Sequence, residues 1–327
     1  MIVFGPVPSR RLGQSLGINN IPPKHCSYSC VYCQVGRTIE HSIEPRAYYP
    51  VAEVVAQVSE RVREIRARGE PVDFLTFVPD GEPTLDVHLG EAIESLRPLG
   101  IRIAVISNGS LLARADTRAA LGLADWASLK VDAVRADEWR QINRPHHDLR
   151  LPNVLDGMLA FSREFAGELA TETMLIRGVN DGEESVTAIA AFVARLQPRT
   201  AYIGVPTRPT AEHWAAPASE EAVIRAHELF ASWLSRVELL TGHEGAAFGT
   251  TGDVEEDLLS ITAVHPMRED AVRELLRRSC ADWSIVERLC DRGKLEPVRY
   301  RDHWFYVRRF AVHGEPAGGD APPESAG

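Results

Sequence analysis

The chain has 327 residues, with 36 Lys and Arg against 46 Asp and Glu, so its formal net charge is −10. A hydrophobic fraction of 44% and a charged fraction of 25% exclude a wholly disordered chain, and the negative charge argues against non-specific binding to nucleic acid. Five cysteines, an odd and small number, argue against a disulfide framework, and about 150 residues per domain predicts two domains.

Strand-like and helix-like segments alternate along the first 205 residues. Runs rich in β-branched and aromatic residues occupy 16–19, 72–78, 101–106, 126–131, 169–176 and 201–205. Apolar residues recur every three or four positions in 51–65, 89–96, 154–159 and 186–196. Six strands separated by helices predict parallel strands with right-handed crossovers. The pattern predicts an α/β fold, a partial (β/α)6 TIM-like barrel, with a doubly wound sheet as the alternative.

The pattern changes after residue 248. Residues 249–253 have the composition of a linker, and they precede three helix-like segments (255–263, 268–279 and 283–292) and two strand-like segments (295–300 and 304–307). This order predicts a barrel domain over 1–248 and a small winged-helix domain over 249–310. Residues 311–327, rich in Gly, Pro and Ala, are predicted to be disordered.

The charge of the C-terminal segment indicates what kind of partner this segment binds. Residues 268–310 carry 11 Lys and Arg and 8 Asp and Glu, and both signs occur in the segment expected to be the recognition helix. A reader of duplex DNA would keep carboxylates away from phosphate. We therefore expect this domain to dock a peptide or protein, with contact to nucleic acid as the alternative.

No segment is apolar enough to predict a membrane span. The longest apolar stretch has about eight residues, whereas a transmembrane helix needs about 20. We expect a cytoplasmic protein with no membrane contact. In that compartment thiols stay reduced, and clustered cysteines indicate metal binding or catalysis.

Three cysteines fall within eight residues, as C-x3-C-x2-C. Cys26, Cys30 and Cys33 lie in a loop after the first expected strand. Converging thiolates select iron–sulfur clusters, zinc or copper. Zinc would require a fourth ligand, such as His25, His41 or a distant group. Three cysteines favour a four-iron cluster that leaves one iron open.

This run, with Tyr32 just before its last cysteine, resembles the signature of the radical S-adenosylmethionine (SAM) superfamily. The resemblance implies that three thiolates hold a 4Fe-4S cluster, whose fourth iron chelates the amino and carboxylate groups of S-adenosyl-L-methionine. It also implies a one-electron donor such as flavodoxin or ferredoxin. Reduction then splits SAM into methionine and a 5′-deoxyadenosyl radical, which abstracts a hydrogen atom from a substrate.

Later loops resemble the same family. Residues 80–83 (Asp-Gly-Glu-Pro) are similar to its Gly-Gly-Glu-Pro loop, whose backbone receives the SAM amino group, although Asp80 replaces the first glycine. Residues 107–109 (Ser-Asn-Gly) are similar to a ribose-contacting position, and a simple turn is the alternative. The resemblance implies that SAM is bound by Tyr32, Gly81, Glu82, Pro83, Ser107 and Asn108, and Lys130 is a further candidate for the reasons that follow.

Lys130 is one of only three lysines, beside Lys24 and Lys294. Because it lies two residues from Asp132, both side chains should share one face of the strand. Lys130 is expected to pair with the SAM carboxylate or a substrate anion, with a buried ion pair to Asp132 as the alternative. Together with Arg177, which follows the next strand, these two are the candidate catalytic residues.

Further polar segments are candidates for substrate contact. They are 143–146 (Asn-Arg-Pro-His), 177–181, Tyr202 and 207–209. Residues 8–11 (Pro-Ser-Arg-Arg) could cap the pocket, or pair with surface carboxylates.

Residues 3–37 resemble a group catalogued with wyosine-base synthetases, tRNA-modifying enzymes that combine pyruvate with a methylated guanosine. Those enzymes hold a second cluster with three further cysteines, whereas this chain has only Cys280 and Cys290, which we expect to be buried helix residues. A pyruvate-binding lysine would also be needed, and the context of Lys24 does not favour that role over a surface position. A tRNA base is the first candidate substrate, and a peptide or small metabolite is the alternative. An alternative function of another class, which is not enzymatic, is that of an iron–sulfur redox regulator that binds DNA through the winged helix.

Overall fold

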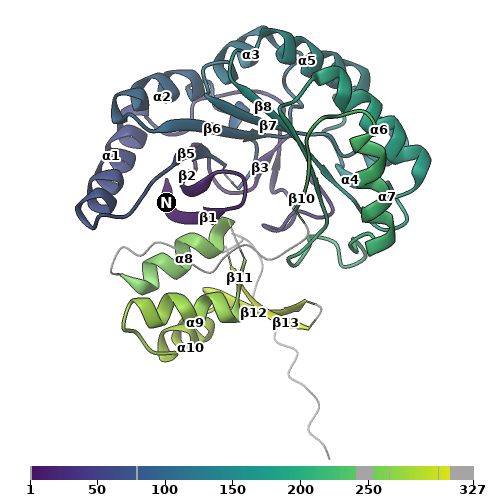
Figure 1. Cartoon of the computed structure of the whole chain (residues 1–327). Helices are drawn as coiled ribbons and strands as arrows, with labels where there is room; N and C mark the ends of the chain where they lie inside the picture. Colours follow the sequence, from purple (N-terminus) through teal and green to yellow (C-terminus); the bar gives the residue numbers. More distant parts are fainter. Residues whose placement is uncertain (1, 79, 241–252, 265, 301, 310–327) are drawn as a thin grey trace, which may run out of the picture.

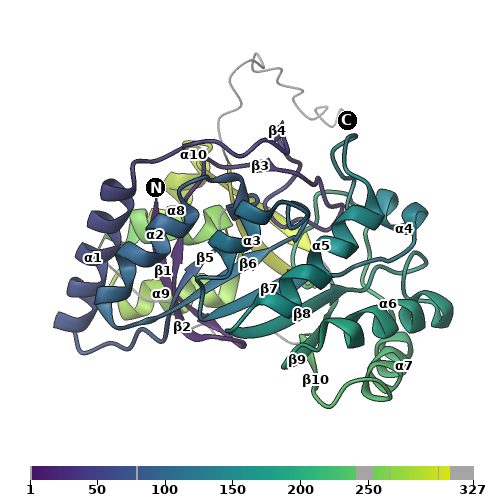
Figure 2. The same cartoon turned by 90° about the horizontal axis from the view of Figure 1, so that it is seen from above.

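The computed structural model describes residues 2–78, 80–240, 253–264, 266–300 and 302–309. Eight strands form one sheet in the order β1-β2-β5-β6-β7-β8-β9-β10. They are β1 (Val3–Ser9), β2 (Gly13–Ile18), β5 (Phe74–Phe77), β6 (Arg102–Ser107), β7 (Trp126–Lys130), β8 (Glu168–Met174), β9 (Thr200–Gly204) and β10 (Val237–Leu240). Strand β1 is antiparallel to β2, and all other neighbours are parallel. The sheet is curled and open (Figures 1 and 2).

Seven helices cover the outer face of this sheet (Figure 1). They are α1 (Val51–Ala67), α2 (Leu89–Leu96), α3 (Ala115–Leu121), α4 (Ala136–Ile142), α5 (Leu151–Glu164), α6 (Glu183–Leu196) and α7 (Glu220–Ala231). Helix α1 illustrates why the helices pack against the sheet. Its apolar residues recur on one face, and all of them are buried: Val54, Val58, Val62 and Ile65. Among the described residues, no helix has the length and apolar character that crossing a membrane requires.

The six expected strands are all present, and the curled sheet with its outer helices confirms an open partial barrel rather than a doubly wound sheet. The count of six was too low. Strand β1 contains Pro6 and Pro8, which cannot donate to a β ladder and are tolerated because β1 is an edge strand. Strand β10 has only four residues and forms the other edge. Two short strands, β3 (His25–Cys26) and β4 (Glu40–His41), pair outside the main sheet.

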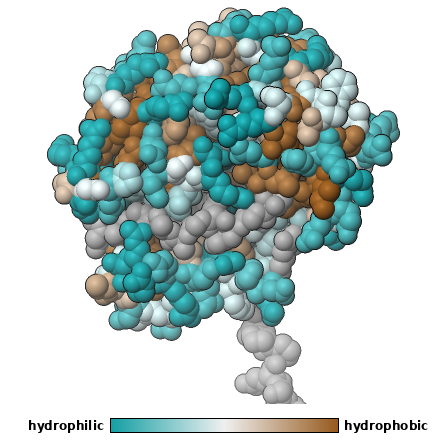
Figure 3. Space-filling view, in the orientation of Figure 1, coloured by the Kyte–Doolittle hydropathy of each residue, from teal (hydrophilic) through white to brown (hydrophobic). Residues whose placement is uncertain are grey.

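The C-terminal unit packs against the β1 edge. It contains α8 (Val254–Val264), α9 (Glu269–Arg278), α10 (Ser284–Asp291) and a sheet in the order β11 (Met267–Arg268), β13 (His303–Arg308), β12 (Leu295–Tyr300). Phe4 and Val7 of β1 share a hydrophobic core with Leu258 and Ile261 of α8, and Figure 1 shows the unit beneath β1. The helices and strands lie where the sequence places them, whereas most of the expected linker and the whole tail 311–327 lie outside the described residues. Hydrophobic surface in Figure 3 gathers over the larger upper unit, and the C-terminal unit shows mainly hydrophilic side chains.

An apolar layer fills the inside of the curled sheet. It includes Phe74, Ala104, Trp126 and Ala170, one from each of four neighbouring strands. Tyr202 of β9 belongs to the same layer and is only 6% exposed. It is therefore a packing residue and does not line the cavity described below, which corrects its assignment as a substrate contact.

Candidate active site

A cavity of about 290 Å³ opens at the carboxyl ends of the parallel strands, where active sites of such folds lie. Its volume is close to the lower end of small-molecule sites, about 300–1,000 Å³. Strand ends and the loops after them supply its wall. The lining includes Arg11, Lys24, Cys26, Cys30, Tyr32, Cys33, Asp80, Gly81, Glu82, Ser107, Asn108, Lys130, Asn143, Glu172 and Arg208.

The loop that carries the three cysteines is held by α4 and by the segment after it. Tyr28 is buried, and its hydroxyl accepts a hydrogen bond from the Trp139 indole N–H at 3.1 Å. The Val31 amide donates to the carbonyl of Ile142 at 2.9 Å. The predicted polar loop 143–146 also packs here, because the His146 amide donates to the carbonyl of Ser27 at 2.9 Å. Contacts between distant segments thus fix the positions of the thiols.

The spacing of the three thiols does not suit a single zinc ion. A zinc ion holds each sulfur at about 2.3 Å, so three thiolates on one ion lie within about 4.6 Å of one another. Across the described chain, only residues 146–148 (His-His-Asp) bring three ligand atoms within 4.8 Å of one another, so the three sulfurs are spread more widely. Of the candidate fourth ligands, His25 has both ring nitrogens engaged, with Nε2 2.7 Å from Glu40 and Nδ1 3.1 Å from the carbonyl oxygen of Pro23. The cysteines therefore fit a multi-iron cluster better than a zinc loop.

Two amides face the sulfur atoms. Asn108 Nδ2 donates to Cys26 Sγ at 3.6 Å, and Asn143 Nδ2 donates to Cys30 Sγ at 3.5 Å. Burial raises the pKa of all three thiols, that of Cys30 to about 12. Buried thiolates need positive charge and N–H donors nearby, and iron with these two amides would supply both. The donor set therefore fits the cluster that the sequence implies.

Gly81 lets the Asp-Gly-Glu-Pro loop approach the cluster loop. The Glu82 amide donates to the carbonyl of His25 at 3.0 Å. A β-carbon at Gly81 would lie 1.9 Å from that carbonyl oxygen, which no side chain can accommodate. This glycine is therefore required for close backbone packing.

Glu82 has a structural role. It is 1% exposed, and its two oxygens accept hydrogen bonds from the Thr84 amide and hydroxyl, from the Ser107 hydroxyl at 2.7 Å and from the Asn108 amide at 2.7 Å. Burial raises the pKa of Glu82, although these hydrogen bonds oppose the rise. Asn108 also donates to Ser27 Oγ at 2.9 Å. Glu82 thus joins two of the predicted SAM-binding loops to each other.

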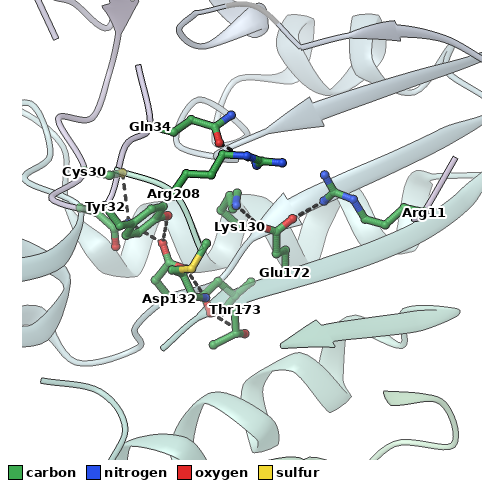
Figure 4. Close-up of polar contacts among 12 residues, drawn as sticks. Arg11, Cys30, Tyr32, Gln34, Lys130, Asp132, Glu172, Thr173 and Arg208 are labelled. Atoms are coloured by element: carbon green, nitrogen blue, oxygen red, sulfur yellow. Dashed lines mark hydrogen bonds and ion pairs between the residues drawn. The ribbon is translucent and has the colours of Figure 1, made fainter. Parts of the chain in front are cut away.

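Lys130 pairs with Glu172, not with Asp132 as one prediction had it. The two residues are register partners on β7 and β8, and Glu172 forms ion pairs with both Lys130 and Arg11 (Figure 4). Burial by itself would raise the pKa of Glu172, but the two cations lower it to about 2. Two cations share one carboxylate, so this wall of the cavity has a surplus positive charge. Glu172 was missed from the sequence, although a carboxylate within an apolar strand is a recognisable signal.

Asp132 positions other residues. It is 2% exposed and accepts a hydrogen bond from the Tyr32 hydroxyl (Figure 4). It also accepts hydrogen bonds from Asn143 Nδ2 at 2.7 Å and from the Met174 amide at 2.8 Å. Burial raises its pKa, and it does not line the cavity. Its hydrogen bonds hold Tyr32 and Asn143 beside the cluster loop, so the structure favours a positioning role for Asp132.

The structure places the remaining candidates in two groups. Arg177 lies exposed in the loop after β8 and is absent from the cavity wall. Arg11, Lys24 and Arg208 line the cavity, and Arg208 donates to Gln34 Oε1 at 2.9 Å. Lys24 thus lines the cavity, a position that the sequence did not predict.

Two cysteines lie apart from this site. Cys280 is exposed, has a φ of 52° and follows α9, which corrects its prediction as a buried helix residue. Cys290 lies in α10 and is partly buried. All five cysteines fall in the described residues, and neither of these two lines the cavity, so they do not reproduce a second three-cysteine site.

Comparison with known proteins agrees with this geometry. The model of the radical SAM superfamily matches residues 20–189, more than half of the chain. The chain therefore belongs to the radical SAM superfamily. It is 45% identical over 311 residues to the UPF0026 protein MJ1312 of Methanocaldococcus jannaschii, covering 94% of this chain and 96% of the relative. It is also 34% identical to a UPF0026 protein of Helicobacter pylori, over 70% of this chain and 73% of that protein.

Solved structures share the fold. A structure of TYW1 with a lysine-pyruvate adduct bound superposes with a TM-score of 0.54 and 17% identity, over 68% of this chain and 74% of the other. A radical SAM methyltransferase from Sphaerobacter thermophilus gives a TM-score of 0.50 and 18% identity, over 70% and 67% of the two chains. At these identities the likeness concerns the fold alone.

Proposed function

We propose that the chain uses the three thiols to hold a 4Fe-4S cluster and cleaves SAM reductively, generating a 5′-deoxyadenosyl radical for hydrogen abstraction from a substrate. The observation that carries this proposal is the wide-set triad of Cys26, Cys30 and Cys33, with two amide donors, inside a cavity of suitable size. A cluster bound there would supply the electron that splits SAM, after reduction by a donor such as flavodoxin or ferredoxin.

The chain's own residues would bind and orient the ligand. Lys130 and Arg11 share Glu172, and their surplus positive charge suits a carboxylate, such as that of SAM, or a substrate phosphate. Lys130 Nζ also lies 5.7 Å from the ring centroid of Tyr32, which keeps that ring beside the charged wall. Ser107 and Asn108 line the cavity at the predicted ribose position.

A tRNA base is the first candidate substrate, supported by the resemblance of residues 3–37 to the wyosine group. The wyosine reaction itself is disfavoured, because Cys280 and Cys290 cannot replace a second cluster site. A peptide or small metabolite is the alternative, and it is supported by the mixed charge of the C-terminal unit. We propose that this unit is a winged-helix domain that docks the substrate or a partner.

Anaerobic reconstitution tests the chemistry. The wild type should bind about four irons per chain and form 5′-deoxyadenosine when SAM and a reductant are added. Cys26→Ala, Cys30→Ala and Cys33→Ala should lose both properties, whereas the control Cys290→Ala should keep them. An intact cluster without SAM cleavage would contradict the enzyme and favour the redox regulator. Binding to tRNA should weaken steeply with salt, and negligible binding at low salt would exclude the tRNA candidate.

A further inference from the structure

Asp80 is a buried carboxylate without a hydrogen-bonding partner. It is 3% exposed, and neither of its oxygens accepts a hydrogen bond from any described residue. Its acidic neighbours differ sharply. Glu82 has its hydrogen bonds to the fold, and Asp86 accepts hydrogen bonds from the His88 amide at 2.9 Å and from Asn20 Nδ2 at 3.2 Å. Asp80 is thus the exception among three buried acids of one loop.

An unpaired buried carboxylate is costly, so its retention needs an explanation. No cation within the described ranges lies within 4.0 Å of the Asp80 oxygens. Burial raises the pKa of Asp80 to about 8, even though Lys24 acts in the opposite direction. Among the described residues, no hydrogen bond therefore accounts for this buried carboxyl group, which directs attention to a ligand.

The position of Asp80 indicates the ligand chemistry. Asp80 lines the same cavity as the three cysteines, and it also lines a second cavity of about 360 Å³ beside α8. The wall that carries Lys130 and Arg11 has a surplus positive charge, whereas Asp80 offers two buried carboxyl oxygens without hydrogen-bond donors, which a bound cation would keep ionised. A ligand with an ammonium and a carboxylate on one carbon would match both charges. The amino-acid end of SAM has this chemistry.

We propose that the Asp80 side chain binds the α-ammonium group of SAM in this cavity. This inference rests on the proposed function and deepens it. The aspartate stands where the family resemblance has a glycine, so a charged side-chain contact would supplement the backbone contact that the resemblance implies. A charge-assisted hydrogen bond of this kind is stronger than a neutral one.

Binding measurements on the reconstituted full-length protein test the proposal. The variants are Asp80→Asn, which keeps the shape, and Asp80→Gly, which restores the Gly-Gly-Glu-Pro sequence. The probes are SAM, S-adenosylhomocysteine, which keeps the ammonium but lacks the sulfonium charge, and 5′-methylthioadenosine, which lacks the amino-acid end. Both variants should bind the first two probes roughly 10- to 100-fold more weakly and the third within about twofold of the wild type. The matched control is Glu256→Gln, because Glu256 is exposed and lines only the second cavity.

Stability separates this role from a structural one. Because the Asp80 side chain has no hydrogen-bonding partner among the described residues, Asp80→Asn should not lower the urea midpoint of the metal-free protein. A lower midpoint together with equal weakening of all three probes would overturn the proposal in favour of a structural role. Weaker binding of SAM alone would indicate that Asp80 contacts the sulfonium group. Unchanged affinities for all three probes would exclude any contact with the ligand. Either outcome would overturn the assignment of Asp80 to the ammonium group. Failure of the wild type to bind iron or SAM would instead contradict the proposed function.

Discussion

Replacing Glu172 by glutamine should destabilise the protein strongly. The Glu172 side chain is 7% exposed and forms ion pairs with both Lys130 and Arg11. The amide is nearly isosteric but neutral, so it leaves two cations close together in a partly buried cavity. Removing one partner of a buried ion pair is costly because the remaining charge is desolvated and uncompensated.

The expected magnitude follows from the pKa of Glu172, which is about 2 compared with an ordinary value of 4.5. This difference corresponds to about 3 kcal/mol of stabilisation by the ionised form. Because the pKa is lowered in the folded protein, this stabilisation is present above about pH 4.5 and is lost as the pH falls toward 2. The free energy of unfolding of the wild type should therefore exceed that of Glu172→Gln by about 3 kcal/mol at pH 7. This difference in stability should become smaller below pH 4.5.

Urea unfolding of the metal-free full-length chain at pH 7 and pH 3.5 measures both effects. Glu168→Gln on the same strand is the control. Its carboxylate is 32% exposed and lies 3.5 Å from Arg102, so its loss should cost less than about 1 kcal/mol. Equal stability of wild type and Glu172→Gln at pH 7 would refute the reasoning, because it would mean that desolvation cancels the ion pairs.

Three further outcomes are expected. Gly81→Ala should lower the free energy of unfolding by about 3–5 kcal/mol, because the added methyl group would collide with the carbonyl of His25. The control is Gly182→Ala, which has open space around it and should be nearly neutral in the same urea titration. Asn143→Leu should lower the reduction potential of the cluster by roughly 40 mV, because an N–H donor to a cluster ligand is lost. An unchanged midpoint potential in an EPR-monitored redox titration would show that this contact has no electronic effect. Since the pKa of Asp80 is raised to about 8, the metal-free wild type should lose stability as the pH rises from 4 through 8. Asp80→Asn should show a smaller loss when unfolding is followed across that range.

The sequence was sufficient where information is local. Apolar periodicity predicted α1, α2, α5 and α6, and runs of β-branched residues predicted six of the sheet strands. It missed β1, whose prolines disfavour a strand assignment, and β10, which is too short to give a clear pattern. The cysteine spacing likewise determined the class of site, because its three ligands lie within eight residues.

Partners across the cavity depended on the tertiary structure. Alternation along β7 predicts that Lys130 and Asp132 share a face, but the strand ends at Lys130, and the next residues turn Asp132 toward Tyr32 and Asn143. The same alternation cannot tell which residue of another strand stands opposite Lys130. That residue is Glu172, 42 positions away, and only the register of β7 against β8 identifies it.

What the sequence by itself determined is therefore the kind of protein: an α/β partial barrel with a three-cysteine site, in which ligand type and spacing are properties of a short stretch of chain. What only the tertiary structure decided is how charges are distributed around that site. It paired Lys130 and Arg11 with Glu172, placed Arg177 and Tyr202 outside the cavity lining, and left Asp80 buried without a hydrogen-bonding partner among the described residues. The physical reason is that burial and charge pairing depend on contacts between residues far apart in the sequence, and these contacts are set by strand register and loop packing.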